Sequence, residues 1–202
     1  MPTADFFRGF GLFVVESFFD RDLCSRLRAD IHGGVPSAGT VGSHGAEFVV
    51  DRDVRRVAQT KINDASTALV KTRLMSLKPD LERHFGVALA DCQAPQFLHY
   101  VTGDFYQPHC DNSPRDDASP ISKSRRISAV IFLNRTSAEP RDDTYGGGAL
   151  TFYKLFDDPV GRSIGFPLEA DEGLFIGFRS DLLHSVAPVT HGDRYTIAGW
   201  YI

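Results

Sequence analysis

Two histidines and one aspartate have the residue types and the spacing of a metal site. One residue separates His109 from Asp111, and His184 follows much later in the chain, next to another predicted strand. On a strand, His109 and Asp111 would point to the same face, because strand side chains repeat with a period of two. A second histidine from a later strand would complete a two-His-one-carboxylate set, which is the ligand arrangement of non-haem Fe(II) oxygenases. The sequence therefore predicts an iron site with coordination positions left open for substrates.

An arginine after the last histidine is a candidate for binding an anion. Arg194 follows His184 by ten residues and begins the last predicted strand, 194–202. A guanidinium group can hold a carboxylate through two parallel hydrogen bonds. Together with the metal ligands, Arg194 indicates an iron enzyme that uses a carboxylate co-substrate.

Other histidines and a cysteine near these residues are predicted to be structural. His191 and Asp193 have the same spacing as His109 and Asp111, but residues 190–193 have the composition of a tight turn, and a turn does not align side chains on one wall. Cys110 should face away from its two neighbours as a small packing residue. His99 should likewise point away from the site.

Composition and charge limit the class of protein. The chain has 202 residues, 42% of them hydrophobic and 24% charged, which fits one domain with a substantial core. Its net charge of −4 argues against a nucleic-acid partner, which usually requires a basic surface. The adjacent arginines at 55–56 and 125–126 are expected to form surface or local ion pairs.

Cysteine usage and hydropathy indicate a cytoplasmic protein without a membrane segment. Cys24, Cys92 and Cys110 form neither a disulfide framework nor a zinc motif, as expected in a reducing compartment. Charged residues interrupt the apolar start of the chain, so no secretory signal is predicted. No apolar stretch reaches the roughly 20 residues that a membrane span needs.

The N-terminal half reads as a strand, two helical regions and a long loop. Asp20 is a candidate N-cap for the first helix, and Asn63 or Asp64 begins the second. Pro79 is expected to kink the second helix or to start a short separate one, which Gly86 ends. The strand is predicted over 10–19, a loop over 33–47 and a short strand over 48–50.

The C-terminal half reads as short strands separated by turn residues, which favours a sandwich or a small barrel. Polar connections are expected at 112–124 and 135–145. The eight strands are predicted over 96–101, 105–111, 126–133, 149–153, 164–168, 174–178, 185–188 and 194–202.

A longer series of motifs resembles one enzyme family. The chain carries Tyr100-x-x-Gly103-x-x-Tyr106-x-x-His109-x-Asp111, then a strand ending Leu133-Asn134, then Gly146-Gly147-Gly148, and finally His184, Arg194 and Trp200. This order resembles the prolyl 4-hydroxylase-like branch of the Fe(II)/2-oxoglutarate-dependent dioxygenases. The resemblance implies an α+β, mainly β fold in one domain, 1–202. Its core would be a double-stranded β-helix, or jelly roll, over 96–202, buttressed by N-terminal helices within 1–95.

The same resemblance implies roles for individual residues. His109, Asp111 and His184 would bind Fe(II), and Arg194 would bind the distal carboxylate of 2-oxoglutarate. Two further aromatic residues, Tyr106 and Trp200, would line the cavity, and Tyr100 would hydrogen-bond the co-substrate. O2 would be the second co-substrate, and an ascorbate requirement is an expectation from the family. The chain departs from the oxygen-sensing prolyl hydroxylases at Phe132, where those enzymes have a tyrosine that contacts 2-oxoglutarate.

The resemblance implies hydroxylation of an unactivated C–H bond, with release of succinate and CO2. The expected substrate is a prolyl or other residue of a protein or peptide, over which loops 33–47 and 112–124 would close. A free amino acid or small biosynthetic intermediate is the alternative, and a cupin-like metal protein without oxygenase activity is a more remote one. The sequence predicts no oligomeric state.

Overall fold

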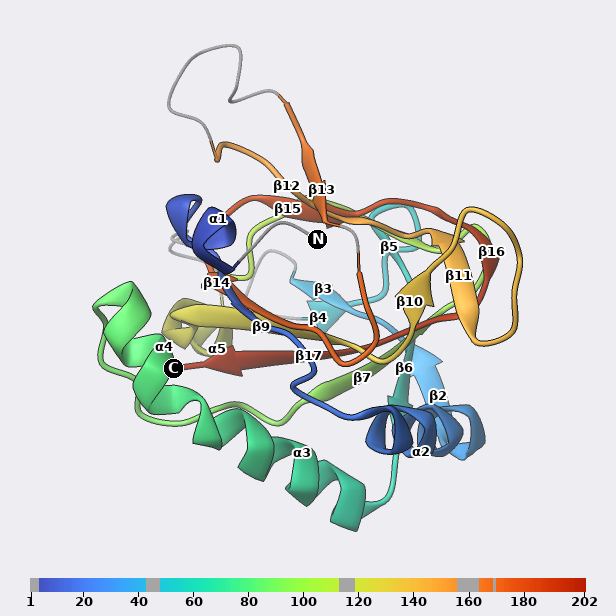
Figure 1. Ribbon diagram of the computed structural model, residues 1–202, viewed down its shortest axis with the longest axis horizontal. Coiled ribbons are helices and arrows are strands. Elements are labelled where there is room, and N and C mark those ends of the chain that lie inside the picture. The colour runs from blue at the N-terminus through green and yellow to red at the C-terminus, as the bar shows by residue number, and fades with distance from the viewer. Residues whose placement is uncertain (1–3, 43–47, 113–118, 156–163, 169) are drawn as a thin grey trace.

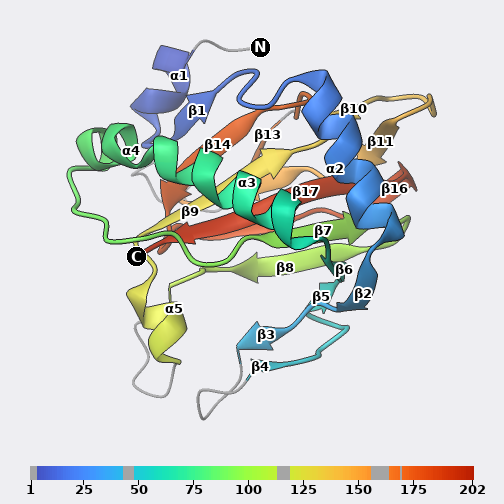
Figure 2. The same cartoon turned by 90° about the horizontal axis from the view of Figure 1, so that it is seen from below.

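Two facing β-sheets, with helices on the outside of one of them, form the core of the structure (Figures 1 and 2). The computed structural model describes residues 4–42, 48–112, 119–155, 164–168 and 170–202. The larger sheet has the strand order β1-β14-β9-β17-β7-β6-β2, and the smaller one has β13-β12-β15-β8-β5. Neighbouring strands within both sheets are antiparallel. The predicted mainly β, jelly-roll fold with N-terminal helices is confirmed.

The elements of the first half are α1 (Ala4–Gly9), β1 (Phe13–Val15), α2 (Arg21–Gly33), β2 (Val35–Ala38), β3 (Val41–Gly42), β4 (Phe48–Val49), β5 (Arg55–Arg56), β6 (Ala58–Lys61), α3 (Asp64–Ser76) and α4 (Lys78–Phe85). Those of the second half are β7 (Gln96–Tyr100), β8 (Phe105–His109), α5 (Pro120–Ser124), β9 (Ile127–Phe132), β10 (Arg135–Thr136), β11 (Thr144–Gly147), β12 (Leu150–Phe152), β13 (Phe166–Leu168), β14 (Phe175–Arg179), β15 (His184–Val186), β16 (Val189–Gly192) and β17 (Arg194–Tyr201). None of the helices in these ranges is long and apolar enough to cross a membrane.

Side-chain caps fix where the two long helices begin. The Asp20 carboxylate accepts a hydrogen bond of 2.8 Å from the Leu23 backbone N–H, and Asn63 accepts one of 2.8 Å from Ser66. Pro79 lies in the first turn of α4, so it starts a separate helix and does not kink α3. Gly86 ends α4 with a left-handed φ of 64°. The predicted caps are confirmed.

Alternation along the central strands divides the interior into two clusters. One lies between the helices and the larger sheet, and the other lies between the two sheets. On β9, Ile131 belongs to the first cluster and Phe132 to the second. On β17 Ile197 packs toward the helices, whereas Arg194 and its period-two neighbours Thr196, Ala198 and Trp200 face the space between the sheets. A single strand therefore supports the core with one face and builds the site with the other.

Several segments differ from the sequence-based prediction. The helix α1 was not predicted, and the connection expected at 112–124 contains α5, with residues 113–118 outside the described ones. Residues 33–47 were predicted to be a loop, but β2 pairs with β6 at the edge of the larger sheet and β3 pairs with β4; residues 43–47 lie outside the described residues. The strands β5 and β6 were not predicted. Residues 190–193 were predicted to form a turn, yet β16 covers most of them and pairs with β11. These short strands, most of them at sheet edges, are held by backbone hydrogen bonds and show no alternation of apolar residues.

Gly173 lies where the backbone of the C-terminal half of the chain passes close to that of the N-terminal half. Its φ is +79°, and a Cβ added there would overlap the carbonyl oxygen of Phe19. We expect Gly173→Ala to lower the free energy of unfolding by more than about 3 kcal/mol, because a left-handed conformation and a backbone clash add up. Gly86→Ala is the matched control, since its φ is +64° and no atom lies within 4 Å of the added Cβ. Urea unfolding should show a loss of only about 1 kcal/mol for this control. Equal losses for the two variants would contradict the steric explanation.

Candidate active site

The two histidines of the predicted metal site lie side by side on neighbouring strands. β8 ends at His109, which pairs directly with His184 at the start of β15. Asp111 was predicted to continue the same strand, but it lies two residues beyond the end of β8. The next residue, Asn112, donates its backbone N–H to the Ser180 carbonyl, which turns the chain toward β9 and β14. Asp111 therefore reaches the two histidines because the chain bends after β8. It does not share a strand face with His109, as the spacing had suggested.

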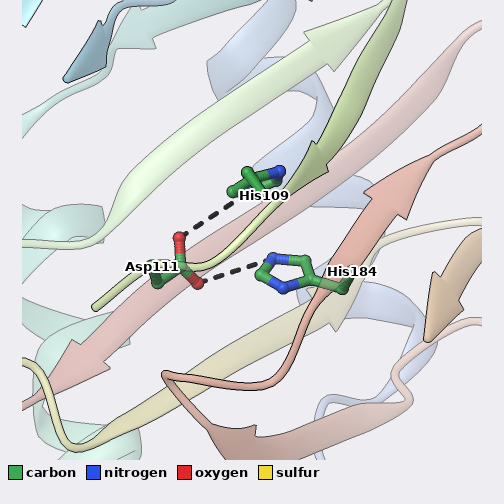
Figure 3. A group of neighbouring side chains, drawn as sticks. All are labelled: His109, Asp111 and His184. Carbon is green, nitrogen blue, oxygen red and sulfur yellow. Dashed lines mark ion pairs between the residues drawn. The ribbon is translucent and has the colours of Figure 1, made fainter. Parts of the chain in front are cut away.

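The three side chains converge on one point (Figure 3). The distance from His109 Nε2 to Asp111 Oδ1 is 3.7 Å, and that from His184 Nε2 to Asp111 Oδ2 is 3.6 Å. The candidate ligand atoms of all three residues lie within 4.8 Å of one another. Two imidazoles and one carboxylate at this spacing match the donor set of a non-haem Fe(II) site.

Backbone carbonyls orient both imidazole rings. His109 Nδ1 lies 2.8 Å from the Gln107 carbonyl oxygen, and His184 Nδ1 lies 2.9 Å from that of Leu182. A carbonyl can only accept, so each Nδ1 carries the proton and donates it. Each Nε2 then presents a lone pair to the site, as in most histidines that bind a metal. The arrangement fits an iron ion.

Burial and neighbouring charges hold the site in its metal-binding protonation state. Burial, with the nearby His184, lowers the pKa of His109 to about 3, so the ring is neutral at physiological pH. Burial alone would raise the pKa of Asp111, but the histidines, Arg125 and a hydrogen bond from Ser128 outweigh it and lower the pKa to about 2. A neutral imidazole and an ionised carboxylate are the forms that bind metals.

Ser128 supports Asp111 from β9, and nothing in the sequence motif points to this residue. Its Oγ donates a 2.7 Å hydrogen bond to Asp111 Oδ2 and lies 2.9 Å from Ser180 Oγ. We expect Ser128→Ala to weaken Fe(II) binding about 10-fold or more, because the carboxylate loses the group that orients it. Titration of the apoprotein with Fe(II) under anaerobic conditions measures this, with the exposed Ser37→Ala on β2 as the control. Unchanged affinity in Ser128→Ala would show that Asp111 needs no such support.

Arg194 lies at the closed end of the space between the sheets. It is 1% exposed, and its Nη1 donates a 3.1 Å hydrogen bond to Thr196 Oγ1. Its guanidinium carbon lies 4.8 Å from the centre of the Tyr100 ring and 5.3 Å from that of Phe132. No described residue accepts a hydrogen bond from its Nε.

A second polar atom without a partner lies beside Arg194. The Tyr145 ring is centred 5.9 Å from the guanidinium carbon, and its buried hydroxyl has no hydrogen-bond partner among the described residues. Burial raises the pKa of Tyr145, so the hydroxyl keeps its proton. Buried donors without acceptors are costly. A carboxylate at this end would supply the acceptors, so the residues fit a co-substrate such as 2-oxoglutarate. Tyr145 was not predicted as a site residue, although it directly precedes the Gly146-Gly147-Gly148 motif.

A cavity of about 1020 Å³ connects the two histidines and Asp111 to Arg194. The metal-site residues and Arg194 line it, together with the three aromatic residues singled out from the sequence, Tyr100, Tyr106 and Trp200. The Tyr106 ring stacks on His109 with 3.5 Å between the ring centres. Burial raises the pKa of Tyr106 to about 12, so its hydroxyl is uncharged and the ring forms part of the cavity wall. The volume exceeds what a small dicarboxylate needs, which leaves room for a second molecule.

Both arginine pairs depart from the surface ion pairs that the sequence suggested. Arg55 and Arg125 are 7% and 9% exposed, and both line the cavity. Arg55 lies 4.8 Å above the centre of the Tyr106 ring, and Arg125 lies 3.8 Å above that of Trp200. Stacking on aromatic faces explains why these two guanidinium groups turn inward.

The cysteine and histidines judged structural have mixed outcomes. Cys110 is exposed and donates to the Asp181 carbonyl at 3.2 Å, so it is not the small packing residue that was predicted. His99 points away from the cavity and stacks on Tyr195 with 4.5 Å between ring centres. His191 covers Gly146 on β11, and it is absent from the cluster of metal-binding groups found among the described residues.

Comparison with known proteins assigns the family. Residues 95–202 match the profile of the 2OG-Fe(II) oxygenase superfamily. The chain belongs to this superfamily. It is 31% identical over 106 residues to a PKHD-type hydroxylase of Shewanella sp. strain ANA-3, covering 52% of this chain and 41% of that protein. It is 28% identical over 165 residues to a PKHD-type hydroxylase of Klebsiella pneumoniae, covering 80% of this chain and 64% of that protein. The chain thus spans less than two thirds of the length of these relatives.

Solved structures of prolyl hydroxylases share the fold. A prolyl-4-hydroxylase from Pseudomonas putida superposes with a TM-score of 0.69 at 23% identity, covering 98% of this chain and 95% of that one. A prolyl hydroxylase from Trichoplax adhaerens, in complex with a peptide fragment of hypoxia inducible factor, gives a TM-score of 0.71 at 18% identity, covering 98% and 86%. These likenesses cover the N-terminal half as well as the region of the family profile.

Proposed function

We propose that the protein is an Fe(II)- and 2-oxoglutarate-dependent dioxygenase that hydroxylates an unactivated C–H bond. The observation that carries the proposal is the convergence of His109, Asp111 and His184 in one cavity with the buried Arg194. In this proposal the first three residues hold Fe(II), and Arg194 holds the distal carboxylate of 2-oxoglutarate. Tyr100, which lies against Arg194, contributes a hydrogen bond to the same co-substrate.

The bound iron and 2-oxoglutarate supply the oxidising power: one oxygen atom of O2 ends in succinate and the other in the product hydroxyl, with release of CO2. The residues of the chain bind and orient. The neutral His109 and the ionised Asp111 need no proton transfer before the metal binds. The aromatic walls formed by Tyr106 and Trp200 exclude water from the site.

The substrate in this proposal is a prolyl or other residue of a protein or peptide. The mouth of the cavity is lined by β3 and α5, from the two segments expected to close over a substrate, and by β4, which pairs with β3. Apolar side chains are exposed there, with Phe48 at 42% and Ile121 at 54%, as suits an extended chain that crosses the opening. The Trichoplax relative of this fold binds a peptide, which supports the same class of substrate here.

A mass-spectrometric screen tests this substrate class. The protein is incubated with Fe(II), 2-oxoglutarate and O2, once with a pool of proline-containing peptides and once with a pool of free amino acids. A peptide that gains one oxygen atom while succinate forms supports the proposal. A product found only among the free amino acids would replace it with the small-molecule alternative. Succinate formation that no pool stimulates would contradict both substrate classes.

Three further properties belong to this proposal. The chain is one domain, a proposal supported by the larger sheet, which contributes residues to both core clusters. The three cysteines are unpaired, which suits the reducing cytoplasm. Ascorbate supports turnover, which a comparison of succinate yields with and without it would test.

A further inference from the structure

Arg125 is a buried cation that uses only its Nε for a hydrogen bond to another described residue. It follows α5 and is 9% exposed, and its guanidinium lies flat over Trp200, 3.8 Å from the ring centre. Its Nε donates a 3.1 Å hydrogen bond to Gln93 Oε1. Within the described ranges, neither terminal nitrogen of this guanidinium has a hydrogen-bond partner. The group is therefore held from one side, and none of the residues described in the structure binds its two terminal nitrogens.

The charge of Arg125 also lacks a partner. It forms no ion pair with a carboxylate of the described residues, although Asp111 is close enough to act on it electrostatically. Burial lowers the pKa of Arg125, because moving its charged guanidinium out of water costs free energy. A buried charge of this kind is costly until an anion is placed beside it.

Among the described residues, the charges around the cavity leave one cation without a matching carboxylate. Three arginines line it, Arg55, Arg125 and Arg194, against two carboxylates, Asp51 and Asp111. Fe(II) and 2-oxoglutarate carry equal and opposite charges, so their binding leaves this balance unchanged. In the proposed function Arg194 is used by 2-oxoglutarate. Arg55 already donates to the Thr40 carbonyl at 2.8 Å and to Gln96 at 3.4 Å. Arg125 is the cation that remains available.

We propose that Arg125 binds a carboxylate of the substrate to be hydroxylated, so that the enzyme selects an anionic substrate. A guanidinium presents two parallel N–H donors to a carboxylate, and stacking on Trp200 fixes their plane. The carboxylate can be an acidic side chain near the reacting residue of a peptide, or the terminal carboxylate of a small molecule. This inference rests on the proposed function and adds a substrate class to it.

Two pairs of probes that differ only in charge test the inference. The first pair is acetyl-Pro-Glu-amide and acetyl-Pro-Gln-amide, which tests a side-chain carboxylate. The second is N-acetylproline and N-acetylprolinamide, which tests a terminal carboxylate. Each is titrated by calorimetry into protein saturated with Fe(II) and 2-oxoglutarate under anaerobic conditions. The acid of at least one pair should bind about 10-fold or more tightly than its amide. The pair that shows the preference identifies the source of the carboxylate.

Two matched variants test whether Arg125 causes the preference for the acid. Arg125→Gln should remove the preference for the acid, whereas Arg126→Gln, which changes the exposed neighbour, should keep it. Both variants should retain the visible band of the Fe(II)–2-oxoglutarate complex, which shows that the site is still folded. Equal binding of acid and amide in both pairs by the wild type would overturn the inference, as would a preference that survives in Arg125→Gln. Absence of the band in the wild type would instead refute the proposed function.

Discussion

Replacing His184 by alanine should abolish Fe(II) binding and turnover, and this is the largest single effect that we expect. His184 is 4% exposed, its Nδ1 is bonded to the Leu182 carbonyl, and its Nε2 points at Asp111. Loss of a direct ligand removes one of three protein donors, so iron affinity should fall by at least about 100-fold, more than the loss of a supporting residue would cause. Iron content after anaerobic loading, together with succinate release, measures both effects.

His191→Ala is the matched control for this prediction. His191 also stands two residues before an aspartate, but it lies on β16 and covers Gly146 on the neighbouring strand. Its removal should leave iron content and turnover nearly unchanged. Loss of iron in His191→Ala, with iron retained in His184→Ala, would show that the ligand assignment is wrong.

The second large effect should come from Arg194. Arg194→Ala should retain Fe(II) but weaken 2-oxoglutarate binding about 10- to 100-fold, because a hydrogen-bonded charge pair contributes on the order of 1.5–3 kcal/mol. The guanidinium is fully buried beside Tyr100 and Thr196, so water compensates little for its loss. Calorimetric titration of iron-loaded protein with 2-oxoglutarate measures the change.

Arg135→Ala provides the control for lost positive charge, since Arg135 is exposed on β10. Its affinity for 2-oxoglutarate should equal that of the wild type. If Arg194→Ala bound 2-oxoglutarate as tightly as this control does, the co-substrate would not lie at the closed end of the cavity.

Patterns among neighbouring residues predicted the helix caps and the two faces of the last strand. Asp20 and Asn63 cap helices through hydrogen bonds to residues three positions later. On β17, alternation places Arg194 and Trp200 on the cavity side and Ile197 on the helix side. In each case the signal lies within a few residues, so a single sequence contains it.

Features that depend on distant partners were not predictable in the same way. β2 is a strand because β6 offers it backbone hydrogen bonds, and its own residues show no apolar alternation. Arg125 turns inward because Trp200, far along the chain, presents a ring face to it. Asp111 reaches the metal site through a bend, which the spacing of the motif does not reveal. Tertiary contacts decide all three.

Anaerobic titration of Fe(II)-loaded protein with 2-oxoglutarate tests the central claim most directly. A weak visible charge-transfer band should grow and saturate as the co-substrate chelates the iron held by His109, Asp111 and His184. Its absence from His184→Ala would tie the band to this site. An iron-loaded wild type that showed no band at any 2-oxoglutarate concentration would contradict the dioxygenase proposal and favour a metal protein of another activity.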